Sequence, residues 1–282
     1  YFGVAEPMSH YVYPALPEIA NHAKDAQLAT FFHWGIHAWA IFAVMGLVLA
    51  YFSFRYKLPL SIRSGLYPIL GDRIHGWIGD VVDIFALVST FFGISTSMGF
   101  GVMQLNAGLV HLGLLRHSDF LFQCAIIIVV SALAISSAVA GVNKGVKRLS
   151  EINIGAAIVM LLFVLFLGPT TFLLSAFLEG VGNYIENFAT LTFNTFAFEK
   201  AGRGWFTNWT VMFWAWWISW APFVGLFIAR ISKGRTIRES VLAVLLVPSL
   251  FIFLWMTVFG NGAIWMDRNV VGGALSRLVD NP

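Results

Sequence analysis

Long apolar runs separated by short charged segments dominate this chain. Six runs are long enough to cross a hydrocarbon core about 30 Å thick, because a membrane-spanning helix needs about 20 predominantly apolar residues. Each run lacks charge across its middle, as a lipid-embedded helix requires. The pattern therefore predicts six spans, at about Ala29–Ser53, Trp77–Asn106, Leu121–Val142, Ile152–Phe177, Trp209–Ala229 and Ser240–Phe259.

The segments outside these spans complete the predicted layout. Glu179–Phe188 mixes acidic, amide and aromatic residues, a pattern typical of a short amphipathic helix on the membrane surface. Tyr1–Pro7 has the character of the tail of an earlier helix. Because the chain begins without Met and stops at Pro282 with no closing segment, we expect an internal fragment of a longer protein, with residues 1–282 forming part of one transmembrane domain.

Composition agrees with the membrane class. The chain is 59% hydrophobic and 11% charged, whereas soluble domains carry about 25% charged residues. The expected fold is therefore that of an all-α, polytopic membrane protein. The net charge of +3 comes from short basic clusters between apolar runs, so no nucleic-acid partner is expected. The single cysteine, Cys124, excludes a disulfide framework and a cysteine-based metal site.

The distribution of basic residues predicts an orientation. The loops after the first, third and fifth spans hold 11 of the 17 Lys and Arg residues. The positive-inside rule places these loops in the cytoplasm. We expect the chain to be part of a multi-pass protein of the cell (inner) membrane. The loops concerned are residues 55–73, 144–148 and 230–238.

Tryptophans gather in the fifth predicted span. Trp220 precedes Arg230 by about 15 Å of helical rise, and Trp216 and Trp217 lie about 20 Å from that end. This depth is mid-membrane rather than the interfacial belt where membrane tryptophans are enriched. Packing against lipid or core stays open beside a second interpretation, an aromatic lining for a quaternary-ammonium cation. Pro222 is expected to interrupt the helix and free backbone carbonyls beside these rings.

Aromatic residues also mark the first span. Trp39 and Phe42 are three residues apart and share a helix face. Trp34 lies about 32 Å from Arg55 along the helix, so a place in the outer aromatic belt is an alternative for it.

A histidine pair in the same span raises a metal alternative. His33 and His37 are spaced i, i+4 and could ligate a metal or haem. The sequence offers no second histidine pair and no obvious intramembrane carboxylate to complete such a site. Metal ligation is therefore the minor interpretation.

The segment from Trp216 to Glu239 resembles the signature of the betaine/choline/carnitine transporter (BCCT) family. It is long and contiguous, so chance is a poor explanation, and the resemblance extends over essentially the whole chain. Shorter stretches agree with it: Gly3-Val-Ala-Glu6-Pro7, His33-Trp34 to Trp39, Pro68-Ile-Leu-Gly71-Asp72 and Gly141-Val-Asn-Lys144-Gly145.

The resemblance implies a twelve-helix protein with a LeuT-like core of two inverted repeats, commonly a homotrimer. This chain would run from the end of the third helix through the ninth. The implied function is secondary active transport of glycine betaine, choline or carnitine by alternating access, with no enzymatic activity and no organic cofactor. The implied substrate-binding residues are an aromatic box of Trp34, Trp39, Phe42 and Trp217, extended along the pathway by Trp216 and Trp220.

Two positions depart from the family pattern. Betaine carriers of the family often have tyrosine where Phe42 stands, so a phenolic hydroxyl is missing. Sodium-coupled members use two threonines one turn apart; here Thr90 is present but Ile94 offers no oxygen. Thr90 and Phe223 are the candidate ion-coupling residues, and Na⁺, H⁺ or substrate exchange all stay open. A His-ligated metal or haem protein and a channel for organic cations are the alternatives to transport.

Overall fold

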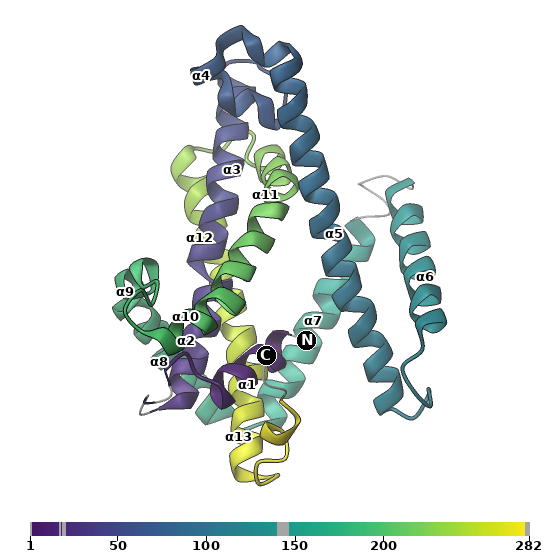
Figure 1. Cartoon of the computed structure of the whole chain (residues 1–282), viewed down its shortest axis with the longest axis vertical. Helices are drawn as coiled ribbons and strands as arrows, with labels where there is room; N and C mark the ends of the chain where they lie inside the picture. Colours follow the sequence, from purple (N-terminus) through teal and green to yellow (C-terminus); the bar gives the residue numbers. More distant parts are fainter. Residues whose placement is uncertain (1, 17, 19–20, 140–146, 280–282) are drawn as a thin grey trace. The chain divides into compact units, whose positions relative to one another are not determined.

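The structure is a computed structural model that describes residues 2–16, 18, 21–139 and 147–279 (Figure 1). The chain divides into two compact units, Tyr1–Phe91 with Leu167–Pro282, and Phe92–Phe166. The described residues form helices and loops without strands, which confirms the all-α prediction. Lys144 and the Gly141–Gly145 stretch lie outside the described residues, so the structure does not test them.

Six helical stretches among the described residues are long and apolar enough to cross a membrane. They overlap the six predicted spans, which confirms a polytopic membrane protein. Their bounds are His22–Arg55, Trp77–His111, Phe120–Ser137, Lys147–Leu167, Lys200–Ile231 and Ile237–Asn269.

The first span consists of two helices, α2 (His22–Trp34) and α3 (Ile36–Arg55), which meet at Gly35. A Cβ atom at Gly35 would lie 2.5 Å from the Phe253 ring and 2.5 Å from the carbonyl oxygen of Phe31. Only a glycine allows this close approach of the Phe253 ring. The break between α2 and α3 therefore depends on a contact with Phe253, which is distant in the sequence, so the hydropathy pattern does not predict it.

The fourth predicted span was placed too far along the chain. Helix α7 (Lys147–Leu167) ends before Gly168-Pro169, and α8 (Thr170–Glu186) begins after it. Proline disfavours helical backbone at the preceding residue, so the helix stops there instead of at Phe177. The predicted amphipathic segment is the end of α8 together with the start of α9 (Phe188–Phe193).

The fifth span differs from the prediction at Pro222. Helix α11 (Met212–Ile231) continues through this buried proline, so the expected interruption is wrong. Proline removes one backbone hydrogen bond, but helices that pack in membranes tolerate this loss. The irregular turn lies earlier, in the π-helical segment η4 (Phe206–Val211), which follows α10 (Lys200–Trp205). Such π-helical turns are frequent at functional sites.

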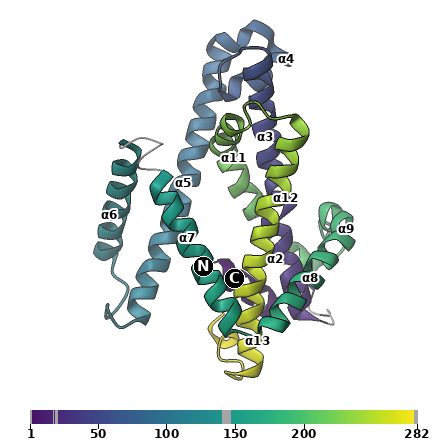
Figure 2. The ribbon, with the colours of Figure 1, turned by 180° about the vertical axis from the view of Figure 1, so that it is seen from behind.

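Helices α3, α11 and α12 (Ile237–Met256) form the centre of the first unit (Figures 1 and 2). Glycines allow α3 and α11 to approach each other closely. A Cβ at Gly46 would lie 2.4 Å from Cγ2 of Ile228, and one at Gly225 would lie 2.4 Å from Cγ of Met45. Small residues at such crossings are typical of membrane helix packing. This crossing holds the aromatic residues of α3 against those of α11.

The loop after α3 is tied to the start of α5 (Trp77–His111). The Arg63 guanidinium lies 2.8 Å from Oδ1 of Asp80 and 2.6 Å from Oδ2 of Asp83. The remaining elements are α1 (Phe2–Val12), η1 (Ile62–Leu66), α4 (Tyr67–Leu70), η2 (Gly71–His75), α6 (Phe120–Val139), η5 (Thr257–Asn261), α13 (Gly262–Asn269) and η6 (Ser276–Leu278).

Candidate functional site

The structure brings Trp34, Trp39, Phe42 and Trp217 into one group of touching rings, called here the aromatic cluster. The ring centroids of Trp34 and Trp217 are 5.0 Å apart, those of Phe42 and Trp217 5.9 Å, and those of Trp39 and Phe42 5.6 Å. All three contacts are edge-to-face, which is a favoured geometry for aromatic pairs. Residues of α2, α3 and α11 that the sequence singled out separately therefore meet in space.

Two further predicted residues flank the aromatic cluster. Trp216 stacks on Trp217 with a centroid distance of 5.3 Å and an interplanar angle of 5°. Trp220 packs against the buried hydrophobic group that contains Phe42, and its ring lies 5.8 Å from that of Phe223. Their positions along α11 fit an extension of the cluster, and their role in a pathway stays a prediction.

The spacing of the rings limits where a cation could bind. The edge of one ring touches the face of the other between Trp34 and Trp217, so a trimethylammonium group cannot lie between them. The indole rings of Trp34, Trp39 and Trp217 are only half-buried, whereas Phe42 is buried. A cation must therefore bind on the accessible ring faces or separate the rings on entry.

Hydrogen bonds fix the two central indoles. Nε1 of Trp217 donates to the backbone carbonyl of His33, 2.9 Å away. This carbonyl lies at the end of α2, where helix carbonyls lose their intrahelical partners. The break at Gly35 thus provides the acceptor. Nε1 of Trp34 donates to Oε2 of Glu6 in α1.

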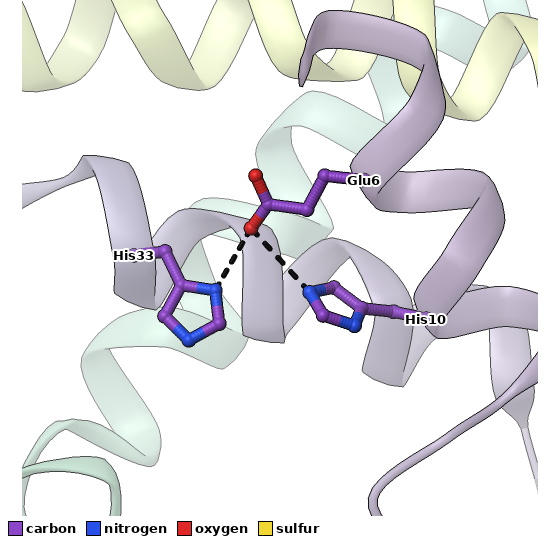
Figure 3. Close-up of side chains that lie close together, drawn as sticks. All are labelled: Glu6, His10 and His33. Carbon is purple, nitrogen blue, oxygen red and sulfur yellow. Dashed lines mark hydrogen bonds and ion pairs between the residues drawn. The ribbon is translucent and has the colours of Figure 1, made fainter. Parts of the chain in front are cut away.

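Glu6, His10 and His33 form a buried polar group, called here the Glu6 cluster (Figure 3). Oε1 of Glu6 lies 2.8 Å from Nδ1 of His33 and 3.4 Å from Nε2 of His10, and the three side chains are at most 2% exposed. The expectation that no intramembrane carboxylate accompanies His33 was therefore wrong. The sequence did contain one indication of this group, because Glu6 is a carboxylate in the apolar segment before Pro7.

Both histidines of the Glu6 cluster use their second ring nitrogen as well. Nε2 of His33 lies 3.0 Å from Oγ1 of Thr210, in the π-helical segment η4. Nδ1 of His10 accepts a hydrogen bond from Nε1 of Trp205, 3.1 Å away. The last residue of α10 and the irregular turn that follows it thus provide partners for a cluster whose carboxylate comes from α1.

His37 does not join His33 as a ligand pair. Its Nδ1 lies 2.7 Å from the hydroxyl oxygen of Tyr184, and its Nε2 lies 2.8 Å from Oγ1 of Thr192. His33 and His37 therefore point to separate sets of partners, and the i, i+4 metal site considered from the sequence is not assembled.

The candidate ion-coupling residues, Thr90 and Phe223, have contacts of their own. Oγ1 of Thr90 donates to the Ala86 carbonyl within α5 at 2.9 Å. Ile94, further along the same helix, is exposed and has no oxygen ligand to offer. Phe223 is half exposed and touches Trp220. A coupling role for Thr90 and Phe223 stays a prediction.

Comparison with known proteins gives a consistent assignment. The family model described as BCCT, betaine/carnitine/choline family transporter, matches residues 1–281. An uncharacterized transporter of Haemophilus influenzae is 54% identical over 100% of this chain and 42% of its own length. The high-affinity choline transport protein of Escherichia coli (strain K12) is 49% identical, over 97% of this chain and 40% of its own length. The glycine betaine transporter of Acinetobacter baylyi is 47% identical, over 94% of this chain and 40% of its own length.

The chain thus spans less than half the length of these relatives. The match to the family model, over residues 1–281, includes both groups of residues described above. The relatives with a named substrate are transporters, not enzymes. With a family model matched from end to end and this level of identity, the chain belongs to the betaine/carnitine/choline (BCCT) family of membrane transporters.

Proposed function

We propose that this protein carries a quaternary-ammonium compound, such as glycine betaine, choline or carnitine, across the membrane by alternating access. The aromatic cluster is the observation that supports this function. It combines accessible ring faces from α2, α3 and α11 at a depth estimated as mid-membrane from the helical rise. The coupling ion, Na⁺ or H⁺, and a homotrimeric assembly belong to the same proposal.

The chemistry of the substrate matches the chemistry of the cluster. A trimethylammonium group has no N–H with which to make hydrogen bonds, so recognition depends on shape and on attraction to aromatic faces. Each desolvated contact of this kind contributes about 2 kcal/mol or more. Phe42 is buried and has no hydroxyl, so the proposed cluster relies on the faces of the three indole rings more than on polar contacts.

Substitution of Trp217 tests the proposal. Trp217→Leu keeps an apolar side chain and removes the aromatic face, so binding of choline and betaine to the full-length protein should weaken about thirtyfold, at 1.4 kcal/mol per tenfold. Isothermal titration calorimetry in detergent measures the affinity. Trp255→Leu in α12 is the matched control, because Trp255 touches Phe251 and Phe259 instead of the aromatic cluster. It should bind like the parent.

Two outcomes would contradict the proposal. Folded Trp217→Leu and Trp39→Leu variants that bind these ligands like the parent would show that the cluster is only a packing unit. Uptake assays in proteoliposomes separate a transporter from a channel for organic cations. Accumulation of choline against its electrochemical gradient, driven by an imposed ion gradient, is expected of a secondary transporter and excludes a channel.

A further inference from the structure

We propose that the Glu6 cluster is a proton-binding site connected to the aromatic cluster through Trp34, so that release of its proton strengthens cation binding. The assignment of the proton site rests on contacts within the first unit. Its effect on the ligand rests on the proposed function. The two parts are tested separately below.

The Glu6 cluster needs one additional proton to be electrically neutral. Among the described residues, the Glu6 carboxylate contacts His10, His33 and Trp34, and no lysine or arginine pairs with it. With both histidines neutral, the buried cluster carries one negative charge. Burial of an uncompensated charge costs several kcal/mol. Addition of one proton makes the cluster neutral, so the buried arrangement favours the protonated form.

The hydrogen-bond pattern can hold this proton without rearrangement. The indole nitrogen of Trp205 is only a donor, so Nδ1 of His10 accepts and neutral His10 carries its proton on Nε2, toward Glu6. The hydroxyl group of Thr210 can either donate to Nε2 of His33 or accept from it. Protonated His33 can therefore donate to Glu6 through Nδ1 and to Thr210 through Nε2.

The same pattern disfavours a metal ion. The nearest ligand atoms of Glu6, His10 and His33 lie within 4.8 Å of one another, a spacing at which a metal could be considered. A metal would need the lone pair on Nε2 of His10, but the bond from Trp205 places the proton on that nitrogen. Metal binding would have to break this bond, whereas proton binding keeps it.

Water can reach the edge of the Glu6 cluster. A cavity of about 130 Å³ borders His10 and Thr210, with Asp25 and Trp205 also in its wall. This volume has room for a few water molecules at about 30 Å³ each. The cavity thus offers a route by which a proton can enter or leave through His10.

Other titratable and charged groups lie on the elements packed around the Glu6 cluster. His37 pairs with Tyr184. Asp267 of α13 accepts hydrogen bonds from Leu275 and Ser276. Asp25 of α2 is the acidic residue in the wall of the cavity. The charged residues on these elements also include Lys24 of α2, Arg55 of α3, Glu179 and Glu186 of α8, Lys200 and Arg203 of α10, Arg230 of α11, Arg238 and Glu239 of α12, and Arg268 of α13, and η5 has none.

Trp34 connects proton binding to cation binding. Its indole N–H donates to Oε2 of Glu6 while its ring belongs to the aromatic cluster. Without the extra proton, the negative charge of the Glu6 cluster attracts a cation on the ring face and makes that face more electron-rich. With the proton, this attraction is lost. Affinity for the cation should therefore rise as pH rises and the proton leaves.

Calorimetry of the full-length protein tests this connection. Choline affinity should increase about tenfold between about pH 5 and pH 8, within the 5- to 150-fold range of coupled sites. Titrations in buffers of different ionisation enthalpy should show that choline binding releases a proton. Glu6→Gln should abolish both effects, and His33→Gln is a second variant in case Glu6→Gln does not fold. His37→Gln, outside the cluster, should retain both.

The outcomes separate the two proposals. Proton release that persists in folded Glu6→Gln overturns the assignment, as does a stoichiometric metal in purified protein that is lost in this variant. If the parent binds neither choline nor betaine at any pH, the proposed function fails. The proton site is then judged by acid–base titration without ligand. The parent should take up about one more proton than Glu6→Gln between about pH 8 and pH 5, and equal uptake overturns the site.

Discussion

The indole nitrogen of Trp34 donates a hydrogen bond to Oε2 of Glu6, which joins α2 to α1. The ring of the same tryptophan touches Trp217 in α11, with centroids 5.0 Å apart. One side chain therefore belongs to the aromatic cluster and contacts a buried carboxylate. Its two functions, ring face and N–H donor, can be separated by substitution.

Trp34→Phe removes the N–H group and keeps an aromatic face. Cation binding should weaken by less than tenfold, because part of the cation–π attraction remains. The dependence of choline affinity on pH should largely disappear, since the bond to Glu6 is lost. Calorimetric affinities at about pH 5 and pH 8 measure both quantities.

Trp39→Phe is the matched control for this change. Trp39 belongs to the aromatic cluster through Phe42, but its indole nitrogen has no hydrogen bond among the described residues. It should lose a similar amount of affinity and keep the parent's pH dependence. If Trp34→Phe also keeps that dependence, the connection through its indole nitrogen is wrong.

The glycines between α3 and α11 should be intolerant of larger side chains. Gly46→Val would place atoms against Ile228, where even a Cβ would lie 2.4 Å from Cγ2. Overpacking of this kind typically costs about 1–3 kcal/mol. Thermal unfolding of the detergent-solubilised protein should show a lower midpoint. Gly182→Ala is the control, because a Cβ there meets no atom within 4 Å. Equal midpoints for Gly46→Val and the parent would contradict the close crossing.

Much of the fold was predictable because the bilayer imposes one dominant pattern. Apolar length located all six spans, and the basic loops suggested their orientation. The ends of helices were less predictable. The break at Gly35 depends on the ring of Phe253, and α11 continues through Pro222 because its surroundings tolerate the lost hydrogen bond. These features arise from contacts between helices distant in the sequence.

The two clusters differed in how far the sequence could predict them. Helical rise placed Trp217 at mid-membrane depth, and the family resemblance grouped it with Trp34, Trp39 and Phe42. The Glu6 cluster was missed because His33 and its partner Thr210 come from other elements than Glu6 and His10, which lie i, i+4 in α1. Glu6 precedes His33 by 27 residues, and Thr210 follows His33 by 177. A periodic pattern within one segment cannot predict contacts between residues so far apart in the sequence.

The pair of threonines that helps to build a sodium site in sodium-coupled members of the family is incomplete in this chain. Ile94 stands where a second threonine would supply an oxygen, and Oγ1 of Thr90 already donates to Ala86. At most one conventional sodium site is therefore expected. Choline uptake into proteoliposomes should be compared with sodium or potassium outside, with and without a proton gradient. A sodium dependence with a Hill coefficient near two would contradict this expectation.

The orientation of the basic loops can be tested by labelling single cysteines in the full-length protein after Cys124 is replaced. The excess of Lys and Arg predicts that Arg73→Cys, Lys147→Cys and Lys233→Cys face the cytoplasm. These three positions are exposed, so lack of access to the reagent would reflect the membrane and not burial. A membrane-impermeant maleimide should label them only after the cells are permeabilised. Exposed positions on the opposite side, Arg116→Cys and Lys200→Cys, should react in intact cells. The reverse pattern would invert the orientation, and labelling of all five in intact cells would contradict the alternation of loops that six spans require.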